Sequence, residues 1–386
     1  MATGSSAQKR DSPLVLKTDD RKRGQSPGAG GPWDETVRKY KRPHRWKSAW
    51  QIANSLLPFC AGWYLMYLSL SWSYGLTLLL ALPTAGFLVR IFIIQHDCGH
   101  HSFFKSRRAN DLLGAACSLF TLTPYYLWRR THARHHSSSG DLSHRGQGDI
   151  GVLTVDEYLA RSWFGRLKYR LYRNPLLMFG PGASFLFIVQ HRLTLGIPRT
   201  WRRERRGVMA TNVALAVGVG LAWWAIGLPA FLMVHLPIVM LGSAAGTWLF
   251  FVQHQYEHAY WEPHDNWNFM ASALDGSSYY RLPAVLQWFT GNIGFHHIHH
   301  LDSRIPNYNL PACYDEEPAL QQAVTLDLRE SLRCASLKLW DERRQRLVTF
   351  ADAWRDAAGA AEERATPVAP LGVQAGKDRK PSQRVA

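Results

Sequence analysis

Two long stretches of the chain contain no lysine or arginine, and they constrain the fold more than any other feature. The first extends from Ser48 to Val89 and the second from Gly207 to Tyr280. A helix needs about 20 apolar residues to cross a bilayer, and each stretch holds two such segments, residues 48–70 and 76–95 in the first and 208–227 and 229–253 in the second. A short uncharged connection joins the two segments of each pair. The pattern predicts two helical hairpins in a membrane.

Positive charge brackets both hairpins on the same side. The net charge is +16, and basic residues concentrate in residues 38–47 and 129–206. The positive-inside rule therefore predicts that both termini and the histidine clusters described below are cytoplasmic. No nucleic-acid-binding motif accompanies the basic residues, so we expect them to contact anionic membrane lipids and not nucleic acid. Residues 161–173 and 199–206 also suit an acidic protein partner.

The remaining segments complete the predicted fold. We expect a disordered basic tail over residues 1–35, a membrane domain over 36–315, a cytosolic helical segment over 316–363 and a disordered tail over 364–386. Prolines interrupt the apolar residues 112–128 and 175–190, which predicts interfacial helices. The expected fold class is an all-α membrane protein with four transmembrane helices in two hairpins and a cytosolic helical cap.

Eight of the 17 histidines fall in three clusters that lie beside the predicted spans. Residues four apart, or three apart, share one face of a helix. Such spacing relates the members of each cluster, which are His96 and His100; His132, His135 and His136; and His296, His299 and His300. A fourth pair, His254 and His258, follows the last predicted span with the same four-residue step.

The three clusters supply eight imidazoles, and one or both of His254 and His258 raise the set to nine or ten. A zinc site uses about three or four protein ligands, so nine or ten histidines are too many for one ion and predict two. Imidazole suits iron, zinc, copper and nickel, so the ligands alone leave the metal open. The other histidines at positions 44, 144, 191, 235 and 264 are predicted not to be ligands.

Metal-bound imidazoles need partners that hold the second ring nitrogen. The candidates for this outer role lie close to the clusters in the sequence, and they are His101, His297, Asp141, Glu257 and Asn292. Asp97, Asp149, Asp265, Asp275 and Asp302 also lie in or near these stretches. Each acidic residue has the alternative of a helix cap or a surface charge.

The clusters resemble the three histidine boxes of the integral-membrane fatty-acid desaturases, H-x(3,4)-H, H-x(2,3)-H-H and [HQ]-x(2,3)-H-H. They stand here as residues 96–100, 132–136 and 296–300. The resemblance covers roughly residues 40–315. Short sequence segments that flank the boxes resemble those of bacterial acyl-lipid desaturases of the omega-6 or delta-12 kind. They are residues 138–142, 148–150, 154–158, 252–257 and 292–295.

The resemblance implies a membrane fatty-acyl desaturase that inserts a cis double bond. It implies a non-haem centre of two iron ions, O2 as co-substrate, and an external electron donor such as ferredoxin with its reductase. The ligands would be the box histidines with His254 or His258. The acyl substrate would be linked to lipid, CoA or carrier protein, and the enzyme would lie in the bacterial inner membrane.

Two other functions compete with this expectation. A related membrane hydroxylase or ketolase that acts on alkyl, carotenoid or sphingolipid substrates has the same boxes, and the box spacing does not separate them. A non-enzymatic membrane metal binder, such as a transporter, would place ionisable residues near the middle of the spans. Here only His235 is central.

Overall fold

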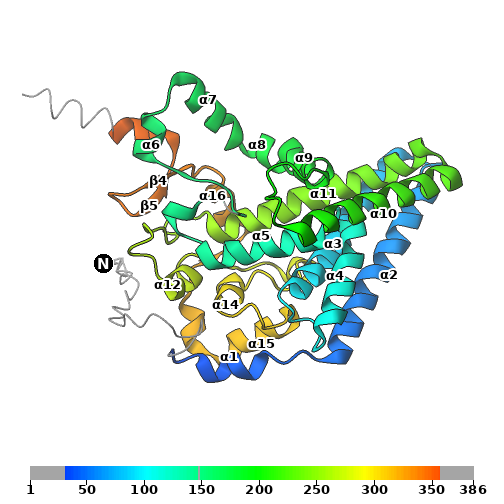
Figure 1. The fold of residues 1–386 in the computed structure, drawn as a ribbon, viewed down its shortest axis with the longest axis horizontal. Helices are drawn as coiled ribbons and strands as arrows, with labels where there is room; N and C mark the ends of the chain where they lie inside the picture. The colour runs from blue at the N-terminus through cyan, green and yellow to red at the C-terminus, as the bar shows by residue number, and fades with distance from the viewer. Residues whose placement is uncertain (1–30, 147, 357–386) are drawn as a thin grey trace, which may run out of the picture.

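The structure is a computed structural model that describes residues 31–146 and 148–356, and most of these residues are helical (Figure 1). Residues 1–30 and 357–386 lie outside the described part, and with them most of the two predicted tails. Residues 31–35, which were assigned to the N-terminal tail, are ordered. Trp33 is buried beside the first helix, α1 (Asp34–Tyr40), whose Val37 packs into the same apolar cluster as Phe295.

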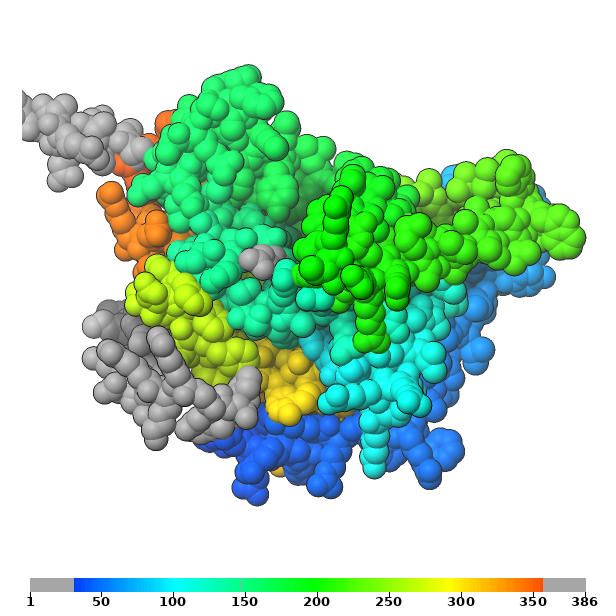
Figure 2. All heavy atoms as spheres, viewed as in Figure 1, coloured from blue at the N-terminus to red at the C-terminus, as the bar shows by residue number. Residues whose placement is uncertain are grey.

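Four long helices form the two predicted hairpins. They are α2 (Arg45–Ser69), α3 (Tyr74–Gly99), α10 (Arg202–Ile226) and α11 (Leu228–His254). The second hairpin turns at Gly227, whose φ of +80° suits a residue without a side chain, and Pro229 then lies in the first turn of α11. The far ends of α2, α10 and α11 project together from the body of the molecule (Figures 1 and 2).

Three of these helices, α3, α10 and α11, are long and apolar enough to cross a membrane. Helix α2 is equally long but is not in this set, so the predicted count of four spans is not confirmed. The first half of α2 carries polar residues that face inward. The hydroxyl of Ser48 donates to the carbonyl of Phe103 (2.8 Å), and the amide of Gln51 donates to Asn307 (3.1 Å).

The hairpins share one apolar core and leave apolar surface outside it. Phe59 of α2, Leu88 and Ile91 of α3, and Ile238 of α11 are buried in the same cluster. By contrast, the apolar part of α10 is not buried within the protein, and Trp224 is 86% exposed. Apolar surface of this extent is characteristic of contact with membrane or with another protein.

The segment between the hairpins consists of short helices and one short strand, β1 (Leu153–Thr154). Helix α4 (Arg107–Thr121) begins at Ser106, whose hydroxyl accepts from the amide of Ala109, and ends at Leu122 in a left-handed conformation. Helix α5 (Tyr125–Ser138) follows Pro124 directly. The expected interfacial region is thus two helices with a break at the proline. The later elements are η1 (Leu142–His144), α6 (Val155–Leu159), α7 (Trp163–Tyr172), α8 (Pro175–Leu177), the π-helical turn η2 (Met178–Gly182), α9 (Ala183–Ile188) and η3 (Gln190–Arg192).

The part after α11 is less helical than the sequence indicated. Its helices are α12 (Phe269–Leu274), α13 (Ala284–Phe289), α14 (His296–Leu301), η4 (Asn307–Asn309), α15 (Leu310–Glu316), η5 (Pro318–Gln322) and α16 (Leu328–Cys334). Strands β2 (Tyr279–Tyr280) and β3 (Thr325–Leu326) pair in parallel. Strands β1 (Leu153–Thr154), β4 (Leu339–Asp341) and β5 (Arg346–Val348) form a sheet in the order β1-β4-β5.

The described chain is mostly helical, as predicted, but it is not all-α. The part of the predicted helical segment 316–363 that the structure describes, residues 316–356, includes strands β3, β4 and β5. The four-residue repeat of Leu320, Val324, Leu328 and Leu332 does not lie on one helix, because Leu320 belongs to η5 and Val324 precedes β3. Leu332 is 68% exposed. Short strands that pair across more than 180 residues, such as β1 with β4, leave no local periodicity to detect.

Candidate metal centre

Four helices converge at the metal-ligating histidines: α3, α5 and α14 carry the three boxes, and α11 carries His254. The end of α3 supplies His96 and His100, α5 supplies the second box, and α14 supplies the third. His254 is the last residue of α11. Because α3 and α11 are the second helices of their hairpins, each hairpin delivers its own histidines to the same place.

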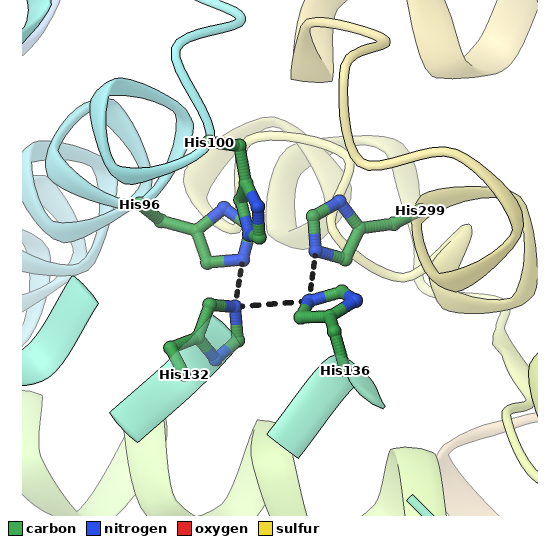
Figure 3. Close-up of side chains that lie close together, drawn as sticks. All are labelled: His96, His100, His132, His136 and His299. Carbon is green, nitrogen blue, oxygen red and sulfur yellow. Dashed lines mark hydrogen bonds between the residues drawn. The ribbon is translucent and has the colours of Figure 1, made fainter. Parts of the chain in front are cut away.

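The histidines form two groups that can each hold a metal ion, with ligand nitrogens within 4.8 Å of one another. The first group is His96, His100, His132, His136 and His299, and Figure 3 shows their rings turned toward one another from α3, α5 and α14. The second group is His135, His254, His296 and His300. The structure therefore brings together nine of the ten histidines that the sequence singled out.

The nitrogen separations fit shared ions better than hydrogen bonds. The Nε2 of His132 lies 3.1 Å from the Nε2 of His96 and 3.1 Å from that of His136, and the Nε2 of His254 lies 3.1 Å and 3.0 Å from those of His135 and His296. In a neutral imidazole each nitrogen has either one N–H or one lone pair, so a single nitrogen cannot form full hydrogen bonds to two neighbouring rings. Two nitrogens bound to one ion at about 2.0–2.1 Å lie about 3 Å apart when they subtend a right angle.

Burial prepares these imidazoles to act as ligands. Desolvation, and then repulsion between neighbouring rings, holds the pKa of His132, His136, His299 and His300 well below the ordinary value. Their neutral rings offer a lone pair to a cation. The buried Nε2 atoms of His100 and His300 have no hydrogen-bond partner among the described residues. A pair of metal ions bound by nitrogen fits these observations.

The first group is supported by a buried carboxylate. Oδ1 of Asp97 lies 3.2 Å from Nδ1 of His96, and its Oδ2 accepts from the backbone amide (2.7 Å) and the side-chain amide (2.8 Å) of Asn307. The side chains of Gln51 and Asn307 are hydrogen-bonded to each other. This chain from α2 to α3 fixes the ring of His96, since the partner of a second ring nitrogen sets its orientation.

The second group is supported by backbone. Nδ1 of His254 lies 3.0 Å from the carbonyl of Gly276. The third box is held by Gly294, whose carbonyl accepts from the amide of Tyr280 (2.8 Å) and where an added Cβ would lie 2.4 Å from the carbonyl of Tyr280. Phe295, which precedes α14, stacks on Tyr279 with ring centroids 4.4 Å apart.

One candidate ligand and two candidate outer partners lie away from both groups. His258 is exposed, in the turn after α11. Glu257 is also exposed, and it forms an ion pair with Arg346 (2.6 Å). His101 contacts Asp111, with Nε2 3.0 Å from Oδ1.

The other three predicted outer partners also contact residues outside the two groups. His297 is buried with its Nε2 2.9 Å from the carbonyl of Leu320, and burial lowers its pKa to about 4. Asn292 adopts a left-handed conformation (φ +59°) and donates to the carbonyl of Asn307. Asp141 is buried and contacts His144 and His264, which are exposed.

A cavity of about 730 Å³ opens beside the histidines. Its walls include His96 and His132 of the first group and His296 of the second. The rest of the lining is mostly apolar and comes largely from α3, α5, α9 and α11, with Phe92, Leu127, Leu186 and Phe250 among the contributors. Trp128 also lines it and stacks on His132 at 4.5 Å between ring centroids. Its size lies within the range of ligand-binding pockets.

Comparison with known proteins agrees with the histidine boxes. The fatty acid desaturase family model matches residues 70–327, two thirds of the chain. The chain is also 43% identical over 314 residues to the fatty acid desaturase of Bacillus subtilis strain 168, a match that covers 81% of this chain and 89% of that protein. The chain belongs to the fatty acid desaturase family. It is therefore an oxidoreductase that acts on fatty-acyl chains.

Matches to more distant members of the family cover a smaller share of both sequences. The chain is 29% identical over 240 residues to the sn-1 acyl-lipid omega-3 desaturase (ferredoxin) of Synechocystis. This match covers 57% of this chain and 61% of that protein. It is 27% identical over 232 residues to the sn-1 oleoyl-lipid 12-desaturase of the same strain, at 58% and 63% coverage. The family and its apolar helices are consistent with membrane association.

Sequence reasoning missed several residues around the histidines. It named Asp97 only as one of several nearby acids, and Asn307, Gln51 and the carbonyl of Gly276 not at all. No spacing pattern relates Asn307 to Asp97, which is 210 residues distant in the chain. The adjacency of Asp97 to His96 was the one available signal.

Proposed function

We propose that this chain is a membrane acyl-lipid desaturase that removes two hydrogens from adjacent carbons of an acyl chain and leaves a cis double bond. Nine histidines, in groups of five and four, would hold two iron ions. Iron held there would supply the oxidising chemistry, with O2 and two electrons from a donor protein, that an alkyl C–H bond requires because it offers no group for acid–base catalysis. The balance is one double bond formed and O2 reduced to water, with two protons taken from solvent.

The single observation that carries this proposal is the cavity that borders both histidine groups. An acyl chain has no polar group along its length, so only apolar contact can hold it. The cavity offers such contact along α3 and α11, and His96, His132 and His296 form part of its wall. A chain bound there would present one pair of carbons to the metal ions and exclude water from them.

The residues of the chain would position the metals and the substrate. Asp97 would hold His96 in one orientation, and the carbonyl of Gly276 would do the same for His254. Trp128, stacked on His132, would form the wall between the metal site and the acyl chain. Neutral histidine ligands, unlike carboxylates, carry no negative charge, so the bound ions would keep most of their positive charge.

The electron donor we propose is a ferredoxin with its reductase. A relative from Synechocystis is named for ferredoxin, which supports such a donor. The basic surface of residues 199–206 offers complementarity to an acidic donor. Arg173, which belongs to the other basic stretch predicted to face a donor, residues 161–173, is fully buried and donates to Gln255, so it does not take part.

We also propose four spans, with α2 as the fourth, and cytoplasmic termini and metal site in a bacterial inner membrane. The lysine and arginine distribution supports this orientation. Cys60 offers a test, because it is exposed on α2 and the other four cysteines are buried. A membrane-impermeant maleimide should leave Cys60 unlabelled in intact vesicles and label it in detergent. Equal labelling in both would exclude α2 from the membrane.

Expression in a bacterial host without such an activity, together with a ferredoxin and its reductase, tests the reaction. Mass spectrometry of the lipids should show acyl chains that have lost a hydrogen pair, and the product fixes the position of the double bond. The His299→Ala variant should give none. Acyl chains that gain an oxygen atom would indicate a hydroxylase, and unchanged lipids would overturn the proposal.

The assignment of the cavity has a separate test. Gly246 lines it, and an added Cβ there would meet no atom within 4 Å. Gly246→Leu should shift the products toward shorter chains without loss of iron, because the side chain fills space that the substrate needs. Gly220→Leu on the exposed side of α10, which also has open space, is the matched control. An identical product profile in both variants would exclude the cavity as the acyl site.

A further inference from the structure

A third cluster of metal-ligating side chains lies outside both histidine groups. It consists of Asp141, His144 and His264, whose ligand atoms lie within 4.8 Å of one another. Oδ2 of Asp141 lies 2.7 Å from Nδ1 of His144 and 2.7 Å from Nδ1 of His264. The sequence had predicted that neither histidine is a ligand. None of the three residues belongs to the groups that border the acyl cavity.

The fold holds this cluster between two loops that follow helices of the metal centre. The loop after α5 pairs with the loop after α11, since the amide of Leu142 donates to the carbonyl of Glu262 (2.9 Å) and the amide of Glu262 donates to that of Gly140 (2.9 Å). Gly140 has φ +73°, and an added Cβ would lie 2.7 Å from the carbonyl of Tyr260. This close approach brings His264 against Asp141.

The electrostatics of Asp141 favour a cation. Its side chain is only 3% exposed, yet its ion-pair partners in the described part of the chain are the two histidines, which are charged only when protonated. Oδ1 of Asp141 also accepts a hydrogen bond from the backbone amide of Ser143 (2.8 Å). None of these described partners carries a fixed positive charge, and a bound cation would supply one to the buried carboxylate.

We propose that Asp141, His144 and His264 bind a divalent transition-metal ion such as Zn²⁺. Two imidazole nitrogens and one carboxylate oxygen are a known donor set for zinc, and water completes the coordination. The side chains of His144 and His264 are 45% and 61% exposed, which leaves room for that water and a path for the ion. The alternative is a cluster of hydrogen bonds without an ion.

The ion would link the loop that leaves α5 to the loop that leaves α11. Helix α5 carries His132, His135 and His136, and α11 ends at His254. A tie between the two loops would fix the relative position of helices that serve both histidine groups. Its role would be structural, because the cluster does not border the cavity.

Metal counting on the purified full-length protein in detergent tests the proposal. After removal of metal and titration with Zn²⁺, the His264→Ala variant should bind one equivalent fewer than the intact chain, and so should Asp141→Asn. His258→Ala, an exposed histidine in the same loop, is the matched control and should bind as many as the intact chain. Zinc that enters the box histidines adds equally to all, so the difference does not depend on the proposed reaction.

A second measurement uses the unmutated protein and avoids any effect on folding. Diethylpyrocarbonate modifies exposed imidazoles, and mass spectrometry locates the products. Zinc should protect His144 and His264 at least tenfold and leave the modification of His258 unchanged. Equal zinc binding by the intact chain and His264→Ala, or equal modification of His264 with and without zinc, would overturn the proposal and leave the hydrogen-bonded cluster.

Discussion

Both histidine groups take ligands from the second and third boxes, but each box gives two histidines to one group and one to the other. In the second box, His132 and His136 join the first group and His135 joins the second. In the third box, His296 and His300 join the second group and His299 joins the first. Residues four apart share a helical face, so each H-x-x-H-H segment sends its i,i+4 pair to one group and its remaining histidine to the other. Two short helices thereby serve two ions.

The two groups differ in the helix that supplies their remaining ligands and in the group that orients those ligands. Helix α3 completes the first group with His96 and His100, and His96 is held by the carboxylate of Asp97. Helix α11 completes the second with His254 alone, which is held by the carbonyl of Gly276. The first group therefore depends on a charged side chain that mutation can remove, whereas the second depends on backbone.

The largest effect is expected from removal of the only ligand that the second hairpin supplies. His254→Ala should abolish desaturation and halve the bound iron, because no other side chain of α11 belongs to the second group. Loss of an outer partner alone costs about 10–100-fold in metal affinity or activity, so loss of a ligand should exceed about 100-fold. Lipid profiling and iron analysis measure both effects.

His258→Ala is the control for this variant. His258 has the same four-residue spacing from His254 that relates His96 to His100, but it is exposed and outside both groups. It should retain activity within about twofold, as surface substitutions usually do. If His258→Ala is inactive while His254→Ala retains activity, the assignment of the second group is wrong.

A smaller and selective effect is expected from Asp97→Asn. The substitution removes the charge that faces His96 but keeps the size of the side chain. We expect iron affinity of the first group to fall about 10–100-fold, while the second group keeps its ion. Iron titration followed by Mössbauer spectroscopy distinguishes the two sites. Equal loss of iron from both groups would contradict the inference that Asp97 supports only the first group.

Gly294→Ala should weaken both groups together. An added methyl would lie 2.4 Å from the carbonyl of Tyr280, so α14 must move, and α14 carries ligands of both ions. Overpacking of this kind costs about 1–3 kcal/mol, which a lower thermal unfolding temperature should reveal. Gly75→Ala, where an added Cβ lies 3.4 Å from a flexible serine hydroxyl, should have little effect.

Local spacing explains what the sequence could predict. Charge gaps located both hairpins, and spacings of three and four residues identified eight of the nine grouped histidines without long-range information. The choice between His254 and His258 depended on where α11 ends, because the chain leaves the helix at Gln255 and turns His258 to the surface. Asn307, Gly276 and the third cluster depend on pairing between distant loops, for which spacing carries no signal.

The smallest expected effect concerns the other acidic residue that adjoins a candidate ligand. Glu257 lies three residues after His254 and directly before His258, much as Asp97 directly follows His96, but Glu257 is exposed and pairs with Arg346 at the surface. Exposed ion pairs contribute about 0–1 kcal/mol. Glu257→Gln should therefore leave iron content unchanged and activity within about twofold, in contrast to Asp97→Asn. A loss of iron from Glu257→Gln would mean that sequence proximity to a ligand, and not contact with it, identifies the outer partners.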